Sequence, residues 1–158
     1  MRHPEVVTRL VLVLSAVVLA GCGGGAAAPA PKTALLTAVK AAPKQVEFRF
    51  RSAPLQIKAG YVPRSKVVES GSGLPVKVAG SAFLVVRFSP ASGADLSGNT
   101  MRIVYKGPRR LKPATPGPVR EVARTSDYEA DLAWAIGLDR KRPYHVTRDG
   151  SNVVVTVG

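Results

Sequence analysis

Short runs in which every second residue is apolar dominate the chain from residue 44 onward. The run at 45–51 reads Gln-Val-Glu-Phe-Arg-Phe-Arg, so its apolar side chains fall on one side and its polar side chains on the other. A period of two residues predicts a half-buried β-strand. The run at 82–88, Ala-Phe-Leu-Val-Val-Arg-Phe, is the most apolar and is expected to be a central strand.

The other alternating runs are separated by glycine and proline, which predicts turns between many short strands. These runs lie at 55–59, 66–69, 76–78, 102–105, 119–125, 132–138, 144–146 and 153–157. The stretches 89–98 and 107–118 are predicted loops, because proline and glycine recur within them. Eight to ten strands of this length, with no run suited to a long helix, predict an all-β sandwich or barrel.

Trp134 is the only tryptophan of the chain. It shares one face of its run with Leu132, Ile136 and Leu138, while small residues occupy the other face. An aromatic face can stack on a sugar ring, but these apolar neighbours favour a place in the core. We therefore predict that Trp134 is buried.

The first 22 residues have the plan of a secretory signal. Arg2 and Arg9 give a positive start, and residues 10–19 are nearly all apolar. That stretch is too short to span a bilayer, which takes about 20 apolar residues. The end of the signal, Leu-Ala-Gly-Cys at 19–22, resembles the lipobox of bacterial lipoproteins, in which the cysteine is lipidated and becomes the new N-terminus. The alternative is an ordinary cleaved signal, or an anchor helix, that happens to contain a cysteine.

The resemblance implies that residues 1–21 are a lipoprotein signal peptide and that Cys22 carries a diacylglyceryl thioether, with palmitate as a typical acyl chain. Two acyl chains suffice for stable anchoring. Residues 22–43 are then a flexible linker of glycine, alanine and proline, and residues 44–158 are one domain. A few helical turns could form at 33–42, but too few for a stable helix. A linker of ~21 residues has an average span of ~25 Å.

The charge of the chain is strongly positive, with 23 basic and 10 acidic residues. Removal of residues 1–21, which hold two arginines and one glutamate, leaves a net charge of +12. Such a charge favours a polyanion as partner. Export argues against nucleic acid, so we expect phospholipid head groups, phosphate-bearing wall polymers or peptidoglycan carboxylates. A solvated basic surface without a specific partner is the alternative. Cys22 is the only cysteine, which excludes a disulfide.

Several stretches match a known family in their order and spacing. They are Val46-Glu47-Phe48-Arg49-Phe50, Tyr61-Val62, residues 71–80, residues 84–91, Val119-Arg120-Glu121-Val122, Asp127-Tyr128-Glu129 and residues 134–140. Together they resemble the AMIN-like domain of actinobacterial exported proteins and lipoproteins, over about residues 44–158. AMIN domains are β-sandwiches that direct cell-wall enzymes and secretion proteins to the envelope, in some cases by binding peptidoglycan. The resemblance therefore implies a β-sandwich with a wall-binding or scaffolding role.

The chain departs from the family pattern at two places. Ala130 stands where a glycine often follows the glutamate, and residues 152–157 lack the acidic residue that is usual near the end of the last strand. Both changes are tolerable for the fold. They weaken any inference about a ligand at those positions.

Residues for catalysis are few. His145 is the only histidine after the signal, and the sequence has no cysteine pair and no His-Glu-x-x-His motif that would hold zinc. No Gly-x-Ser-x-Gly motif supports a serine nucleophile. Asp127, Glu129 and Asp131 alternate on one predicted strand face, and with nearby Asp139 they could do acid–base chemistry on a glycan. We expect instead a solvated edge whose carboxylates pair with arginines, and a structural or exposed His145.

Two basic loops are the candidate ligand-binding regions. One holds Arg109, Arg110 and Lys112 among prolines, and the other is the predicted turn that holds Arg140, Lys141 and Arg142. These loops could equally serve only for solubility. The tyrosines near turns are candidates for surface contacts with sugars, and they are Tyr61, Tyr105, Tyr128 and Tyr144.

The sequence thus predicts a monomeric, non-enzymatic lipoprotein on the outer face of the cell membrane, without a cofactor or a metal. Its β-sandwich is expected to bind cell-wall polymer, either peptidoglycan or an associated anionic polymer. The second interpretation is an accessory subunit that docks on another envelope protein without glycan contact. A third, an envelope hydrolase, is disfavoured by the single histidine.

Overall fold

Most of the alternating runs form β-strands, as their period of two predicts, and no α-helix occurs within the described residues. The computed structural model describes residues 32–158. The predicted signal peptide, Cys22 and the first part of the predicted linker lie outside the described residues. None of residues 32–158 forms a helix long and apolar enough to cross a bilayer.

Twelve strands and one turn of 3-10 helix are present within residues 32–158. The strands are β1 (Ala34–Ala41), β2 (Gln45–Phe50), β3 (Gln56–Val62), β4 (Ala82–Ser89), β5 (Ala91–Ser92), β6 (Ala94–Asp95), β7 (Arg102–Ile103), β8 (Arg110–Leu111), β9 (Val119–Tyr128), β10 (Asp131–Leu138), β11 (Tyr144–Asp149) and β12 (Asn152–Val157). The helical turn η1 spans Arg64–Lys66. Four of the strands have two residues each: β5, β6 and β8 lie in the predicted loops, and β7 is the first part of the strand predicted at 102–105. The three strands within the loops take the number beyond the expected eight to ten.

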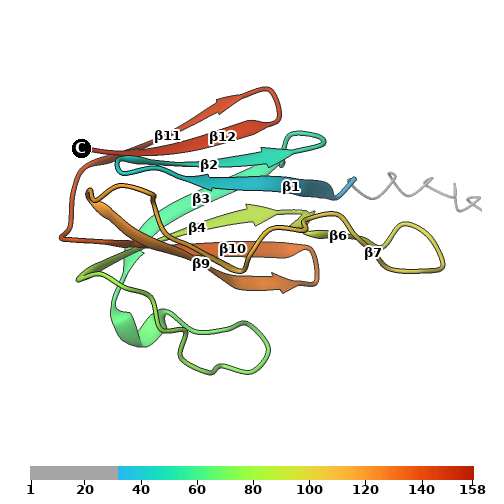
Figure 1. The fold of residues 1–158 in the computed structure, drawn as a ribbon. Coiled ribbons are helices and arrows are strands. Elements are labelled where there is room, and N and C mark those ends of the chain that lie inside the picture. Colours follow the sequence, from blue (N-terminus) through green and yellow to red (C-terminus); the bar gives the residue numbers. More distant parts are fainter. Residues whose placement is uncertain (1–31) are drawn as a thin grey trace, which may run out of the picture. The chain divides into compact units, whose positions relative to one another are not determined.

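Two five-stranded sheets pack face to face as a β-sandwich (Figure 1). One has the strand order β11-β12-β2-β1-β5 and the other β3-β4-β10-β9-β8. Neighbouring strands are antiparallel except for β1 and β5, which are parallel. A small sheet of β6 and β7 stands apart from both. The predicted all-β sandwich is confirmed, and β4 is an interior strand, as its apolar sequence predicts.

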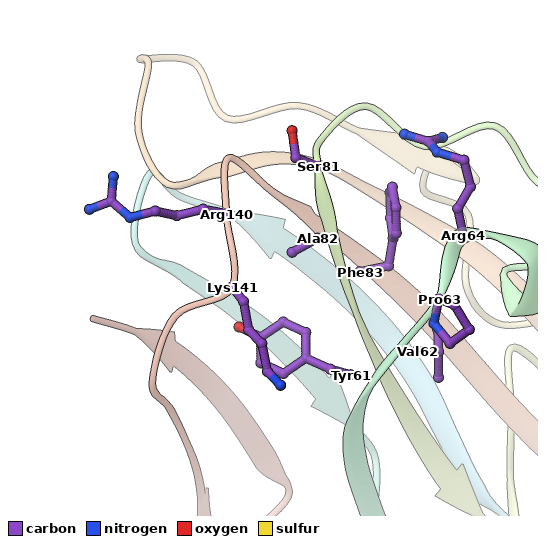
Figure 2. A pocket seen from close by; sticks show the side chains of 9 residues that line it. All are labelled: Tyr61, Val62, Pro63, Arg64, Ser81, Ala82, Phe83, Arg140 and Lys141. Atoms are coloured by element: carbon purple, nitrogen blue, oxygen red, sulfur yellow. The ribbon is translucent and has the colours of Figure 1, made fainter.

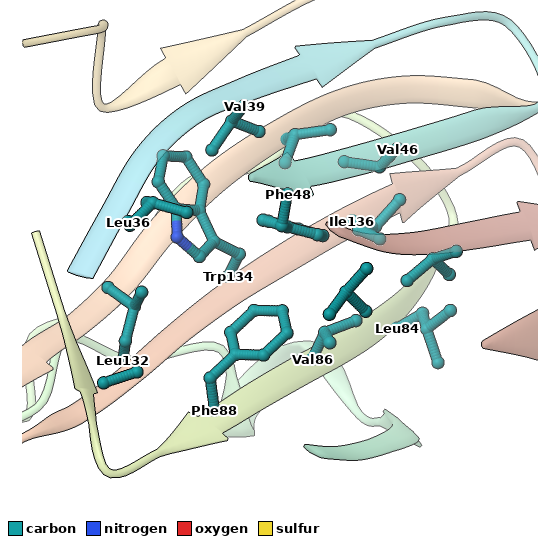
Figure 3. Packing of buried hydrophobic residues seen from close by; sticks show 14 of the residues in the cluster. Leu36, Val39, Val46, Phe48, Leu84, Val86, Phe88, Leu132, Trp134 and Ile136 are labelled. Atoms are coloured by element: carbon teal, nitrogen blue, oxygen red, sulfur yellow. The ribbon is translucent and has the colours of Figure 1, made fainter. Parts of the chain in front are cut away.

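The core between the sheets is built around interlocking aromatic rings (Figure 3). Phe48 of β2 lies 5.0 Å from Phe88 of β4 and 6.1 Å from Trp134 of β10, between ring centroids. Tyr105 meets Trp134 edge-on at 5.6 Å. Tilted and edge-on pairs of this kind add to the free energy gained from burying apolar area. Trp134 is fully buried, as predicted, and cannot be a sugar platform.

Strand β1 corrects the predicted linker. Residues 34–41 are a strand that pairs with β2 and β5, and Ala34, Leu36 and Val39 are buried in the core. The linker assignment is therefore wrong for these residues, and so is the expectation of helical turns. A bulge between Leu36 and Ala38 changes the spacing of buried residues from two to three. That spacing resembles a helix in the sequence.

The segment 63–80 covers the outer face of β10. Val67 and Val78 pack with Phe83, Ala123 and Ala135 in a second, smaller core. The expected strands at 66–69 and 76–78 do not form, apart from one isolated bridge between Val68 and Pro75. The small residues on this face of β10 are needed because the covering backbone lies very close: a Cβ on Gly137 would overlap the carbonyl oxygen of Ala79.

Candidate functional site

An open pocket of about 620 Å³ lies at the end of the sandwich where β3 ends, β4 begins and the chain leaves β10. We call it the basic pocket. Its lining consists of Tyr61, Val62, Pro63, Arg64, Ser81, Ala82, Phe83, Arg140 and Lys141 (Figure 2). Arg140 and Arg64 extend from opposite sides, with Ser81 between them. Three cations, two aromatic rings and a hydroxyl therefore share one opening.

Arg64 is held on its side of the pocket by the helical turn η1. Its guanidinium carbon lies 4.4 Å from the centroid of the Phe83 ring, within the range of a cation–π contact. It also donates hydrogen bonds to the carbonyl oxygens of Val78 (3.4 Å) and Gly80 (2.8 Å). These contacts fix the aliphatic part of the Arg64 side chain and part of its guanidinium group. The charge has no carboxylate partner among the described residues.

Tyr61 forms the floor opposite Arg64. Its hydroxyl donates to the carbonyl oxygen of Arg142 (2.7 Å) and accepts from the amide of the same residue (2.9 Å). Its ring packs edge-on against Tyr144, and the Lys141 ammonium lies 5.4 Å from its centroid. The hydroxyl is thus used to hold the loop after β10, while the ring and Lys141 face the opening (Figure 2).

A second hollow, of about 410 Å³, adjoins the basic pocket at Ser81. Lys112, Arg120 and Asp139 line it together with residues 79–81. The amide of Asp139 donates to the carbonyl of Pro118 (3.0 Å), which joins the two predicted basic loops. Together the two hollows carry five cations, and Asp139 is the one acidic residue in their linings.

The ion pairs of the domain leave the cations of the two hollows without a partner, and these are five of the 14 described lysines and arginines outside such pairs. Residues 32–158 hold 21 lysines and arginines and nine aspartates and glutamates. Seven of those acids form ion pairs, each with an arginine. Every cation that lines the two hollows lies outside these seven pairs. Unpaired cations on one concave surface concentrate positive potential there.

The six basic residues predicted as ligand-binding candidates divide into two groups. Arg109 pairs with Glu69, Arg110 with Glu121 and Arg142 with Asp139, so the charges of these arginines already have carboxylate partners. The other three, Lys112, Arg140 and Lys141, line the two hollows and form no ion pair among the described residues. The structure thus brings together half of the predicted set.

Arg110 and Arg142 are anchored with particular strength. Arg110 donates through Nε and Nη2 to Oε1 of Glu121, whose other oxygen accepts the amide of Ala79 at 2.7 Å. Glu121 is buried, so this network ties β8 and β9 to the segment that covers β10. Arg142 makes a two-point contact with Asp139, at 2.8 Å for each bond. The hydrogen bond from Arg142 is the main reason that the pKa of Asp139 lies well below its usual range.

The predicted acidic strand face does not exist. Glu129 and Ala130 have positive φ angles of 50° and 58° and form the turn between β9 and β10. Asp127 accepts from Ser92, Gly93 and Arg124, and Asp131 pairs with Arg87. The expected pairing of these carboxylates with arginines is confirmed for Asp127 and Asp131. Among residues 32–158, no group of three or more potential ligand side chains is arranged to hold a metal ion.

The predictions for His145 and for the four tyrosines are only partly confirmed. His145 is exposed on β11, in line with the prediction. Tyr61 lines the basic pocket and Tyr144 packs behind it. Tyr128 is exposed at the opposite end of the sandwich, and Tyr105 is buried, which corrects its prediction as a surface residue. Its hydroxyl donates to the carbonyl of Pro108, and that buried environment raises its pKa.

Sequence reasoning missed Arg64, Ser81 and Arg120. Arg64 directly follows the sequence Tyr61-Val62-Pro63, and Ser81 directly precedes β4, so both stand at the strand ends that border the opening. A search for basic and polar residues at the ends of predicted strands would have found them. Arg64 and Ser81 lie close to the loop after β10 because β3 and β10 both pair with β4. The sequence alone does not show this strand pairing.

Comparison with known proteins gives one family. Residues 45–158 match the sequence model of the AMIN-like domain. The match begins at the first residue of β2, so it leaves out β1 and includes every residue that lines the two hollows. No curated protein and no solved structure matches the chain.

Proposed function

The chain belongs to the AMIN-like domain family, which suggests a cell-wall-associated module, and we propose that it is a lipid-anchored envelope protein whose basic pocket binds cell-wall polymer. In this proposal Cys22 carries the lipid, residues 1–21 direct export, and the protein acts as a monomer on the outer face of the cell membrane. The sandwich is a binding module without catalytic activity or cofactor. The observation that carries the proposal is the gathering of five cations without acidic partners around two adjoining hollows.

The chemistry of the opening suits a polymer that bears carboxylates or phosphates. Arg140 and Lys141 stand on one rim with free donors, and Arg64 stands on the other. Charge-assisted hydrogen bonds to carboxylate and phosphate are about twice as strong as neutral ones. The Tyr61 ring adds an apolar surface between them. A volume of about 620 Å³ lies in the range that pockets for small ligands occupy, about 300–1,000 Å³.

The adjoining hollow extends the site in one direction. Lys112 and Arg120 lie beyond Ser81, so a chain that carries repeated negative charges can meet both hollows at once. Contacts at two adjoining sites raise the overall affinity because the second contact becomes intramolecular. This arrangement favours a polymer over a single small anion.

The test is co-sedimentation of residues 32–158, which contain both sheets and the whole described core, with purified cell-wall sacculi. Sacculi with and without their anionic polymers are compared, at low salt and at about 0.15 M, where the screening length is about 8 Å. Saturable binding that survives removal of the anionic polymers indicates peptidoglycan, and loss of binding on their removal indicates those polymers. The absence of binding to either preparation would overturn the proposal and favour docking on another envelope protein.

A pair of variants locates the site. Arg140→Glu with Lys141→Glu reverses two charges in the basic pocket, while Lys58→Glu with Lys77→Glu makes the same charge change at exposed positions outside both hollows. Exposed ion pairs are worth about 0.2–1 kcal/mol each, and reversal replaces attraction by repulsion. We expect the first variant to bind about tenfold more weakly, which corresponds to about 1.4 kcal/mol, and the control to bind less than about threefold more weakly. Equal losses in the two variants would mean that net charge alone drives binding.

A further inference from the structure

The hairpin of β6 and β7 carries a group of exposed apolar side chains. Leu96, Met101 and Ile103 are 66%, 65% and 56% exposed. They are three of the six large apolar side chains that are exposed among residues 32–158, and they lie within eight consecutive positions. Single exposed apolar residues are normal, whereas a group of them marks a surface for a partner or a membrane.

An ion pair and several hydrogen bonds within the hairpin define its conformation. Asp95 and Arg102 pair across it at 2.6 Å, and both the amide and the hydroxyl of Ser97 donate to the other oxygen of Asp95. The amide of Val104 donates to the carbonyl of Gly93 at its base. These bonds hold Leu96, Met101 and Ile103 in an arm that projects beyond the two sheets (Figure 1).

The arm lies at the end of the sandwich where the chain enters the fold. One hollow of about 450 Å³ is lined both by Lys32, Thr33 and Leu35, at the start of β1, and by Leu96 and neighbouring hairpin residues. The parallel pairing of β1 with β5, which directly precedes β6, holds these segments together. The start of β1 and the labels of β6 and β7 lie at the same end in Figure 1.

The distance from this end to the proposed lipid is short. Cys22 stands ten positions before Lys32. A fully extended chain of that length spans at most about 35 Å, and a flexible one spans about 17 Å on average. Because β1 belongs to the sandwich, the tether is about half as long as the sequence predicts. The end of the sandwich that carries the hairpin is therefore the end held closest to the bilayer.

We infer that the β6–β7 hairpin inserts Leu96, Met101 and Ile103 into the surface of the lipid bilayer and so orients the sandwich on the membrane. This inference rests on the proposed lipid attachment at Cys22. Lys32, exposed beside the hairpin, adds a charge that attracts anionic head groups. Once docked in this way, the sandwich has a fixed direction as well as a fixed attachment point.

The orientation has a consequence for the basic pocket. Strand β10 runs from Asp131, beside the hairpin end, to Leu138, beside the pocket. Eight residues at about 3.3 Å each span about 26 Å. The inserted hairpin thus points the basic pocket away from the membrane, toward the side on which wall polymer lies.

The test uses the full lipidated chain in vesicles of phosphatidylcholine and phosphatidylglycerol. Cys22 is blocked by its lipid, so a cysteine introduced by Asn99→Cys, in the tip of the hairpin, takes an environment-sensitive fluorophore. The matched control is Ala114→Cys, an exposed loop position at the pocket end. We expect blue-shifted emission and quenching by spin-labelled lipid at position 99, and neither at position 114. The substitutions Leu96→Ser, Met101→Ser and Ile103→Ser, made together, are expected to abolish the shift and the quenching.

Each outcome separates the inference from the proposal on which it rests. A protein that carries the lipid mass on Cys22 and floats with the vesicles, but shows no quenching at position 99, would overturn the inference and leave the anchor intact. A protein without lipid on Cys22 would overturn the anchor and the inference together. Self-quenching between copies at position 99, without quenching by lipid, would identify the hairpin as a contact between two chains and overturn membrane insertion.

Discussion

Leu36→Ala tests whether β1 is part of the folded domain. The Leu36 side chain is fully buried between the two sheets, in the segment that the sequence assigns to the linker. Burial of a leucine side chain is worth about 1.5–3 kcal/mol, and truncation to alanine also leaves a cavity. We expect a loss of about 2–5 kcal/mol, which is a large part of the 5–15 kcal/mol that holds a typical domain together.

The assay is urea unfolding of residues 32–158, followed by the fluorescence of Trp134, the only tryptophan. The control is Thr37→Ala at the next position, where the side chain is exposed and its hydroxyl donates to the carbonyl of Arg49 at 3.0 Å. Because an exposed hydrogen bond contributes little, we expect the control to cost less than about 1 kcal/mol. A chain that begins at residue 44 is expected to be unfolded or nearly so. If Leu36→Ala cost no more than the control, or if the chain from residue 44 were as stable as the longer one, β1 would not be part of the core.

Two further predictions concern close packing and pH. Gly137→Ala places a Cβ against the carbonyl oxygen of Ala79 and should destabilise the domain by about 1–3 kcal/mol in the same urea assay. The control, Gly60→Ala, has open space around the added atom and should change the free energy of unfolding by less than about 1 kcal/mol. Equal effects of the two substitutions would show that the segment 63–80 is not tightly packed on β10. The Ser97 side chain and amide, with Arg102, lower the pKa of Asp95 to about 2 from an ordinary 3.8. The pKa of Asp95 is lower in the folded state than in the unfolded chain. The Asp95 carboxylate therefore stabilises the hairpin fully above about pH 4, and this contribution is lost as the pH falls through about 2. A carboxyl-carbon titration by NMR should give that midpoint, and Ser97→Ala should raise it; a midpoint that stays in place would remove Ser97 as the cause.

Strand β1 could not be predicted from the sequence because its bulge interrupts the alternation of buried and exposed residues. The sequence Ala-Leu-Leu-Thr-Ala-Val-Lys-Ala at 34–41 buries Ala34, Leu36 and Val39, so the interval between buried residues changes within eight positions. Strand prediction depends on an unbroken period of two. Strands without an interior bulge, such as β2 and β4, were predicted almost to the residue, and so was the buried face of β10 that carries Trp134.

Half of the candidate site could be predicted, because the sequence shows which residues are basic but not which of them form an ion pair in the folded domain. The sequence marks Arg110 and Lys112 as equivalent basic residues of one loop. Only the pairing of β8 with β9 brings Arg110 to Glu121 and leaves Lys112 facing the hollow. The same holds for Arg64, whose place on the rim of the basic pocket follows from the way the segment 63–80 folds over β10.

Amide chemical-shift mapping can locate the surface of the sandwich that contacts cell-wall polymer, which we propose is the basic pocket. The probe is soluble peptidoglycan fragments and, separately, anionic polymer released from the sacculi, each titrated into isotope-labelled residues 32–158. We expect amide shifts at Tyr61, Arg64, Ser81, Arg140 and Lys141 that saturate together with at least one of the two probes and that disappear in the Arg140→Glu, Lys141→Glu variant. Saturable shifts that cluster on another face of the sandwich, or no shifts with either probe, would show that the basic pocket is not the binding surface.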